Sequence, residues 1–117
     1  MWTYRATCIR WLDGDTVALR CDLGFHVFCE QTVRLAGLDT PELRSSDPAE
    51  RGRAVLAHQR VMALLPPGAP CTITTAKGDP ADKYGRFLGR ITLADGTDLN
   101  AALLAEGLAR PYDGGAR

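Results

Sequence analysis

The stretch RLAGLDTPE, residues 34–42, lies where a run of strand-like residues gives way to a turn. A glycine and a proline within it both interrupt regular structure. Around them the sequence places one strong base, Arg34, and two acids, Asp39 and Glu42. A strand end that serves only packing more often carries Val or Thr. We therefore expect this turn both to end a strand of the fold and to hold functional groups.

Three strands are predicted up to this turn. Loose alternation over residues 4–12 and the β-propensity of TVALRCD, residues 16–22, indicate the first two, joined by an Asp-Gly turn. The third is expected from about residue 27 to residue 38, ending near Gly37. Short connections between them predict three sequential antiparallel strands.

A helix is predicted after the turn. SDPAE, residues 46–50, offers Asp47 as N-cap, Pro48 at the first helical position and Glu50 at the third, which is a capping-box arrangement. Apolar residues then recur at helical spacing as far as Leu65, where a proline pair stops the pattern. The segment from Pro48 to Leu65 is thus expected to be an amphipathic helix.

Two more strands and a short helix complete the predicted fold. CTITTAK, residues 71–77, and RFLGRITLAD, residues 86–95, are expected to form a hairpin, and a helix is expected over residues 99–106 with Asn100 or Asp98 as cap. The order β-β-β-α-β-β-α is that of the five-stranded Greek-key barrel called the OB-fold, a mainly β fold with helices (α+β). A small α+β sheet is the alternative, and the long first three strands favour the barrel.

Length and composition narrow the class of protein. The 117 residues suit one domain over residues 1–117, and a formal net charge of zero gives no field that attracts polyanions in general. No segment resembles a secretory signal or a membrane span, so a cytoplasmic, monomeric protein without a membrane partner is expected. The four cysteines lack the spacing of a zinc site and are expected to be reduced thiols.

Three charged clusters lie at the predicted strand and turn ends. Besides the turn at residues 34–42, these are DGDT, which contains Asp13 and Asp15, and DKYGR, which contains Lys83 and Arg86. Each alone is typical of an ordinary hairpin turn, capped turn or solvated loop. Together they indicate a site, because functional groups gather at the ends of strands in barrels.

The oxygen donors in these clusters suit a hard cation. Asp15 and Asp39, with a backbone carbonyl such as that of Thr40, are ligands of the kind that Ca²⁺ prefers. So few protein ligands leave coordination positions for water and for a phosphate oxygen of a substrate.

The remaining charged groups predict phosphodiester hydrolysis. Arg34 and Arg86 could fork phosphate oxygens and stabilise transition-state charge, and Glu42 is left to orient or deprotonate water. Strict alternation would place Arg34 and Asp39 on opposite faces of one strand. A bulge or an early strand end at Gly37 would let them converge.

The motifs DGDTV, VRLAGLDTPE, DKYGR, LN and EGLA resemble, in order and approximate spacing, those of the staphylococcal nuclease (thermonuclease) family. The resemblance extends over residues 6–112. It implies an OB-fold barrel and a Ca²⁺-dependent endonuclease that cleaves DNA and RNA, with single strands preferred, to give 3′-phosphate products.

The resemblance also implies a role for individual residues. It assigns as calcium ligands the carboxylates of Asp15 and Asp39 and the carbonyl of Thr40. It assigns as catalytic side chains Arg34, Glu42 and Arg86. It assigns Asp13 as an acid that supports the metal site, Lys83 and Tyr84 as contacts to a further phosphate of the nucleotide, and Tyr112 as an aromatic ring on which a base stacks.

The sequence departs from the best-known secreted member of that family. It has neutral net charge and a different loop after Asp22, and we expect neither a secretion signal nor a further helix after Tyr112. It is therefore similar to the short, non-secreted type, which includes proteins of phage or prophage origin. The alternatives are a non-catalytic module that binds nucleic acid or protein, and a structural domain. Retention of the complete set of catalytic residues favours the enzyme.

Overall fold

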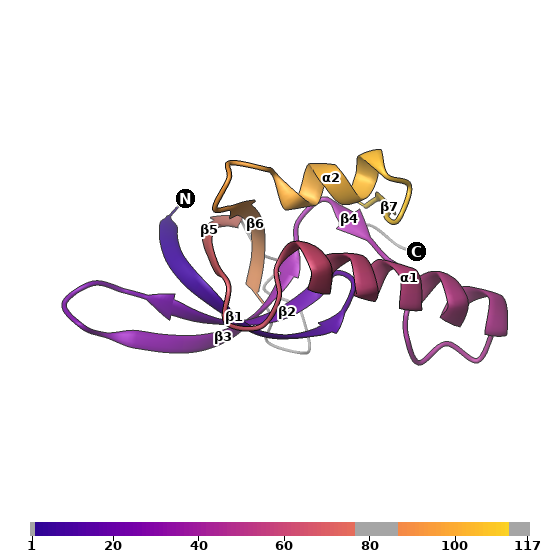
Figure 1. The fold of residues 1–117 in the computed structure, drawn as a ribbon, viewed down its shortest axis with the longest axis horizontal. Helices are drawn as coiled ribbons and strands as arrows, with labels where there is room; N and C mark the ends of the chain where they lie inside the picture. Colours follow the sequence, from indigo (N-terminus) through magenta and orange to yellow (C-terminus); the bar gives the residue numbers. More distant parts are fainter. Residues whose placement is uncertain (1, 77–86, 113–117) are drawn as a thin grey trace.

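A computed structural model describes residues 2–76 and 87–112. Figure 1 labels its elements along the chain. They are β1 (Thr3–Asp13), β2 (Thr16–Asp22), β3 (Phe28–Leu35), β4 (Leu38–Asp39), α1 (Pro48–Leu64), β5 (Pro70–Ala76), β6 (Phe87–Leu93), α2 (Leu99–Ala105) and β7 (Arg110–Pro111). No helix in these two ranges is long and apolar enough to cross a membrane.

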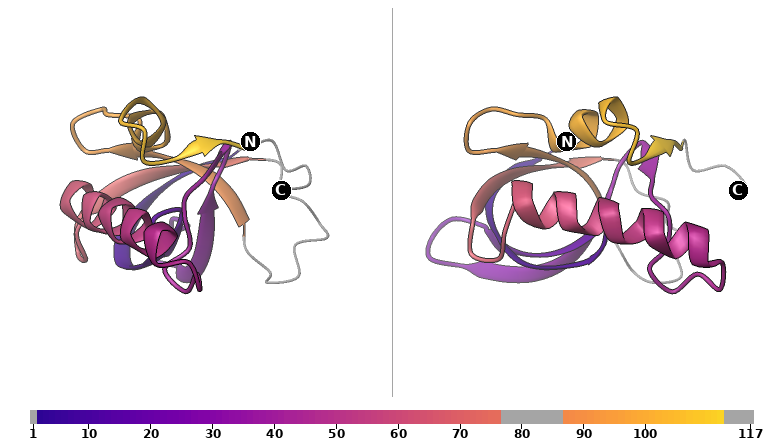
Figure 2. Two further views of the ribbon diagram at one scale, coloured as in Figure 1. Left: turned by 90° about the vertical axis from the view of Figure 1, so that its right-hand side faces the viewer. Right: turned by 45° about the vertical axis from the view of Figure 1, so that its right-hand side comes forward.

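Five strands close into a barrel in the order β1-β2-β3-β6-β5. The neighbours are antiparallel except β3 and β6, which pair in parallel. This is the strand order of an OB-fold, so the predicted barrel is confirmed and the alternative, a small α+β sheet, is wrong. Outside the barrel, α1 packs against β1 and α2 against β6 (Figure 2).

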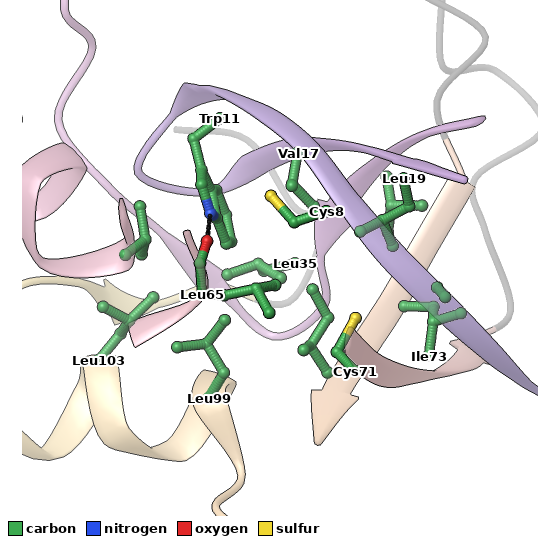
Figure 3. Close-up of a cluster of buried hydrophobic side chains, with 14 of the residues drawn as sticks. Cys8, Trp11, Val17, Leu19, Leu35, Leu65, Cys71, Ile73, Leu99 and Leu103 are labelled. Atoms are coloured by element: carbon green, nitrogen blue, oxygen red, sulfur yellow. Dashed lines mark hydrogen bonds between the residues drawn. The ribbon is translucent and has the colours of Figure 1, made fainter. Parts of the chain in front are cut away.

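The interior of the barrel holds the apolar positions of the alternating strands. Leu19, Ile73 and Ile91 are fully or almost fully buried, and Leu99 and Leu103 of α2 close one side of the core (Figure 3). Trp11 joins the end of α1 to the barrel, because its Nε1–H donates to the Leu65 carbonyl oxygen at 2.9 Å. Burial of these side chains provides the main drive for folding.

At the start of α1 the predicted N-cap is confirmed, but the predicted capping box is not formed. Asp47 caps α1 by accepting from the backbone N–H of Ala49 at 3.1 Å. Glu50 does not reach back to the Asp47 backbone, because it accepts from the hydroxyl of Ser45, which in turn accepts from the N–H of Asp47 at 3.1 Å. The expected capping box is therefore replaced by a relay through Ser45. 

Asp98 rather than Asn100 caps α2, by accepting from the N–H of Ala101 at 3.1 Å. Asn100 is fully buried instead. Its side chain accepts from the N–H of Ile91 at 3.0 Å and donates to the carbonyls of Ala36 at 3.0 Å and Gly89 at 3.2 Å. This side chain therefore fastens the segment after β3 to strand β6 and to α2.

Strand β3 ends at Leu35, three residues before the predicted end. Gly37 has a φ of +80°, which reverses the chain direction, and the next residues form the two-residue strand β4. Strand β4 pairs with β7, which lies after α2. Neither short strand was predicted, because two residues are too few to show alternation.

Candidate functional site

The candidate site lies where β2 begins and β3 ends. Thr16 and Arg34 are cross-strand partners there, and Asp15 is in the turn between β1 and β2. Gly14 allows this turn to lie close to its neighbours, because an added Cβ would be 2.9 Å from Ala57 Cβ. The turn thereby holds the Asp15 side chain in a buried position beside Arg34.

Two buried carboxylates converge on the Arg34 guanidinium. Its Nη2 is 3.1 Å from Asp39 Oδ1 and 3.8 Å from Asp15 Oδ2, and all three side chains are about nine-tenths buried or more. The early end of β3 and the turn at Gly37 bring Asp39 to the same side as Arg34. Burial and ion pairing restrict these three charged side chains to one arrangement, as a preorganised site requires.

The Asp15 carboxylate is also held by hydrogen bonds. Its Oδ1 accepts from the hydroxyl of Thr16 at 3.0 Å, and its Oδ2 accepts from the backbone N–H of Thr40 at 3.2 Å. The side-chain hydroxyl of Thr40 is buried and has no hydrogen-bond partner in the part of the chain that the structure describes. A buried polar atom without a partner is uncommon and marks a place where a bound group could supply one.

Strand β7 and the residue that follows it bring two more side chains to the site. Arg110 is the cross-strand partner of Asp39, and its Nη2 is 3.3 Å from Asp39 Oδ2. The backbone N–H of Tyr112 donates to the Gly37 carbonyl oxygen at 3.0 Å. The centroid of the Tyr112 ring is 4.8 Å from Arg34 Cζ, which is a cation–π contact. The sequence did not indicate Arg110 as a site residue, because nothing in its neighbours shows that this strand pairs with β4.

Asp13 supports the site from the other side of the turn. Its Oδ1 accepts from the backbone N–H of Leu43 at 3.0 Å, which ties the β1–β2 turn to the loop after β4. Burial raises the pKa of Asp13 above its ordinary value, the Leu43 N–H opposes this, and the nearby Asp15 and Glu42 carboxylates raise it further. This part of the site is therefore crowded with acids, and a bound cation would relieve their repulsion.

Glu42 lies in a groove beside the buried cluster. Its side chain is exposed, and the groove has a volume of about 460 Å³ between the loop after β4, the start of α1 and the segment leading to β7. Asp39, Thr40, Arg53 and Arg110 are also among its lining residues. Solvent and a substrate can thus reach Glu42 and one side of the Asp39 cluster. The predicted site residues Lys83, Tyr84 and Arg86 lie outside the described residues.

The donors present fit a hard divalent cation with few protein ligands. Within residues 2–76 and 87–112, no group of three or more His, Cys, Asp or Glu side chains gathers in a way that could hold a metal ion. Asp15 and Asp39 do lie within 4 Å of one Arg34 nitrogen, so both carboxylates already face one positive charge. Two carboxylates and a backbone carbonyl, all oxygen donors, suit Ca²⁺ or Mg²⁺ completed by water and substrate.

A closed barrel of this strand order, with charged groups at the ends of its strands, is an OB-type domain. The family model described as staphylococcal nuclease homologue matches residues 32–116. The chain belongs to this family, which confirms the resemblance found in the sequence.

Three relatives from Bacillus subtilis (strain 168) are named as endonucleases. Over 104 residues, or 89% of this chain, it is 34% identical to Endonuclease YncB and covers 46% of that protein. The same identity, length and share of this chain hold for SPbeta prophage-derived endonuclease YokF, of which 33% is covered. Endonuclease YhcR is 26% identical over 114 residues, which are 93% of this chain and 9% of YhcR. The chain thus spans less than half the length of these relatives.

Proposed function

We propose that this protein is a metal-dependent endonuclease that hydrolyses phosphodiester bonds of DNA and RNA, with Ca²⁺ as its cation. The observation that carries the proposal is the convergence of buried Asp15 and Asp39 on Arg34, beside a groove that Glu42 lines. Membership of the family and the names of the relatives support nuclease chemistry.

In this proposal Asp15, Asp39 and the Thr40 carbonyl hold the cation. When bound, such a cation polarises a phosphate oxygen and neutralises charge that develops in the transition state. Arg34 donates to phosphate oxygens, for which its planar fork is suited, and Tyr112 restricts the guanidinium by packing its ring on it. Arg86 is proposed as the second arginine that stabilises the transition state.

Glu42 is proposed to position the attacking water and to accept its proton. Its exposed carboxylate lies in the groove that Asp39 also lines, so a water can reach both the carboxylate and a phosphate. Attack in line with the 5′-oxygen would release that oxygen and leave a 3′-phosphate, as in the family. Asp13 supports this arrangement by holding the Leu43 N–H.

The substrate is proposed to be a single strand of DNA or RNA bound by one copy of the chain. The groove is open to solvent, and the Arg34 and Arg110 guanidiniums lie at or beside it. Lys83 and Tyr84 would contact a further phosphate, and Tyr112 would pack near the reacting nucleotide.

The test is cleavage of end-labelled single-stranded DNA and RNA with Ca²⁺ and with EDTA. Glu42→Gln should lower the cleavage rate by about 100-fold or more. Glu106→Gln is the matched control, because Glu106 is another exposed glutamate, which forms an ion pair with Arg60 on α1. The control should cleave at the wild-type rate, and the mobility of the products before and after phosphatase treatment should reveal a 3′-phosphate.

Two outcomes would contradict the proposal. Cleavage that continues in EDTA, or at an unchanged rate in Glu42→Gln, would remove the metal or the glutamate from the mechanism. A folded wild-type protein that binds nucleic acid with salt dependence but cleaves none with any divalent ion would instead be a binding module of the same family.

A further inference from the structure

The outer face of the β2–β3 ribbon extends from the candidate site to the far end of the barrel. The two strands pair from Thr16↔Arg34 to Asp22↔Phe28 without a register shift, so every second pair points to the same side. Starting from the site, the pairs on this face are Thr16 and Arg34, Ala18 and Thr32, Arg20 and Glu30, and Asp22 and Phe28. The candidate site and the far end therefore lie at opposite ends of one face of the ribbon.

A second groove opens at the far end of this face. It has a volume of about 360 Å³, and its lining residues include Arg5 and Thr7 of β1, Arg20 of β2, Phe28 of β3 and Thr72 of β5. We call it the distal groove. Arg20 Cζ lies 4.1 Å from the centroid of the Phe28 ring, so cation and ring form one stacked unit. Neither Arg5 nor Arg20 forms an ion pair with any other described residue.

We propose that the distal groove binds a further segment of the single-stranded nucleic acid whose scissile phosphate lies at the candidate site. The proposal rests on the proposed nuclease function. Two arginines that form no ion pair among the described residues can donate to phosphates, and an exposed aromatic ring offers a base a surface for stacking. The chemistry of the distal groove is thus that of sites that bind single strands without reading their sequence.

The distance between the two sites suits a single nucleic-acid strand. Ala18 and Thr32 are the pair between Arg34 and Arg20 on this face; both have small side chains, Ala18 being buried and Thr32 partly exposed. Six residues of β2, at about 3.3 Å each, separate the two ends by roughly 20 Å. An OB-fold commonly covers about 4–16 nucleotides, so one strand can occupy both places.

Two acidic residues on the same face, Asp22 and Glu30, affect how strongly the distal groove would bind phosphates. Asp22 is the cross-strand partner of Arg5 and also lines the distal groove, and its Oδ1 accepts from the N–H of Gly24 at 2.8 Å in the hairpin turn. Glu30 is exposed opposite Arg20 and would repel a phosphate. The proposal therefore predicts opposite effects for two neighbouring residues: neutralising Arg20 weakens binding, whereas neutralising Glu30 strengthens it.

The experiment measures binding of a fluorescent 16-nucleotide DNA and of a trinucleotide in EDTA, so that no cleavage occurs. Arg5→Gln and Arg20→Gln should each weaken binding of the long strand about fivefold at low salt and reduce its salt slope by about 0.7. Phe28→Ala should weaken it about fivefold or more. Glu30→Gln should strengthen it. Arg60→Gln removes the same charge from α1 and should change binding little.

Each alternative outcome overturns the proposal. These are unchanged binding in the groove variants, an equal loss in Arg60→Gln, an equal loss for the trinucleotide, and failure of the wild type to bind the long strand. Melting curves confirm that each variant is folded, and Glu30→Gln tests the proposal independently of any loss. If the wild type binds the long strand through the distal groove but never cleaves it, the nuclease proposal fails and the proposed binding role of the groove stands. If the wild type cleaves while the groove variants bind normally, the nuclease proposal stands and the proposed binding role of the groove fails.

Discussion

The two ends of the β2–β3 ribbon differ sharply although the same two strands form both. At the candidate site, the Asp15, Arg34 and Asp39 side chains are buried and joined by ion pairs. At the other end, the hairpin turn projects away from the barrel (Figure 1), Phe25 is fully exposed, and Gly24, Phe25 and His26 have φ values of +84°, +53° and +60°. One end is enclosed by α1, β4 and β7, whereas the other is surrounded by solvent.

In the proposed nuclease, this difference separates two requirements for acting on a polymer. Chemistry needs charged groups fixed in place, which burial and paired hydrogen bonds provide at the site. Contact with a variable strand needs accessible arginines and rings, and the distal groove offers these. A single ribbon can meet both requirements because its two ends lie in different surroundings.

The largest expected effect is at the enclosed end. Arg34→Gln should lower cleavage by about 100-fold or more, because a donor to the transition state is lost. It should also lower the free energy of unfolding by about 3 kcal/mol, because buried Asp15 and Asp39 lose a positive partner. Single-turnover kinetics and urea unfolding measure the two effects.

Arg34→Lys is the informative companion. Lysine keeps the positive charge but lacks the planar guanidinium that binds two phosphate oxygens at once. Arg34→Lys should therefore restore the free energy of unfolding more fully than it restores the cleavage rate. A wild-type cleavage rate in Arg34→Gln would show that Arg34 has no role in the mechanism. The buried end of the ribbon could then not be distinguished from the exposed end as the place of the reaction.

Asn100→Ala should have the next largest effect, on stability alone. Removing the side chain leaves the Ile91 N–H and the Ala36 and Gly89 carbonyls without their buried partner. The free energy of unfolding should fall by about 3 kcal/mol, measured by urea unfolding. Gln59→Ala, on the exposed side of α1, is the control and should cost less than about 0.5 kcal/mol. Equal losses in both variants would contradict the role assigned to Asn100.

Gly89→Ala tests how tightly the enclosed end is packed. An added Cβ would be 2.3 Å from Ile73 Cδ1 and 3.2 Å from Val33 Cγ1, so we expect a loss of about 1–3 kcal/mol in stability. Ile73→Val removes the nearest atom, so the double variant should lose less than the sum of the single changes. Additive losses in thermal unfolding would show that the crowding lies elsewhere.

The smallest effect is expected at the open end. Phe25→Gly should leave stability unchanged or raise it by up to about 1 kcal/mol, because glycine adopts a positive φ without strain and this side chain buries nothing. Gly24→Ala is the control of opposite sign and should destabilise, since its φ is +84°. A clear loss in Phe25→Gly would show that the turn depends on the ring.

Much of the barrel was predictable because its elements are long. Alternation and turn residues located β1, β2 and the hairpin of β5 and β6, and Asp47 with Pro48 located the start of α1. The end of β3 was placed late, because Leu38 continues the apolar pattern although the chain has already turned at Gly37.

The site was predictable by residue type but not by geometry. The sequence singled out Asp15, Arg34, Asp39 and Thr40, and the structure brings them together, while their roles remain predictions. The part played by Arg110 could not be predicted, because it depends on pairing between two-residue strands that are 71 residues apart. Contacts of that kind follow from the closure of the whole fold rather than from local pattern.

The late position of β7 has a consequence for the timing of biosynthesis. Asp39 emerges from the ribosome 71 residues before Arg110, its partner across the β4–β7 pair. At about 5–20 residues per second, this gap lasts roughly 4–14 s. Throughout that interval the nascent chain carries the acidic half of the site without the Arg110 and Tyr112 contacts that complete it. The β4–β7 contacts at the candidate site therefore form only after almost the whole chain has been synthesised.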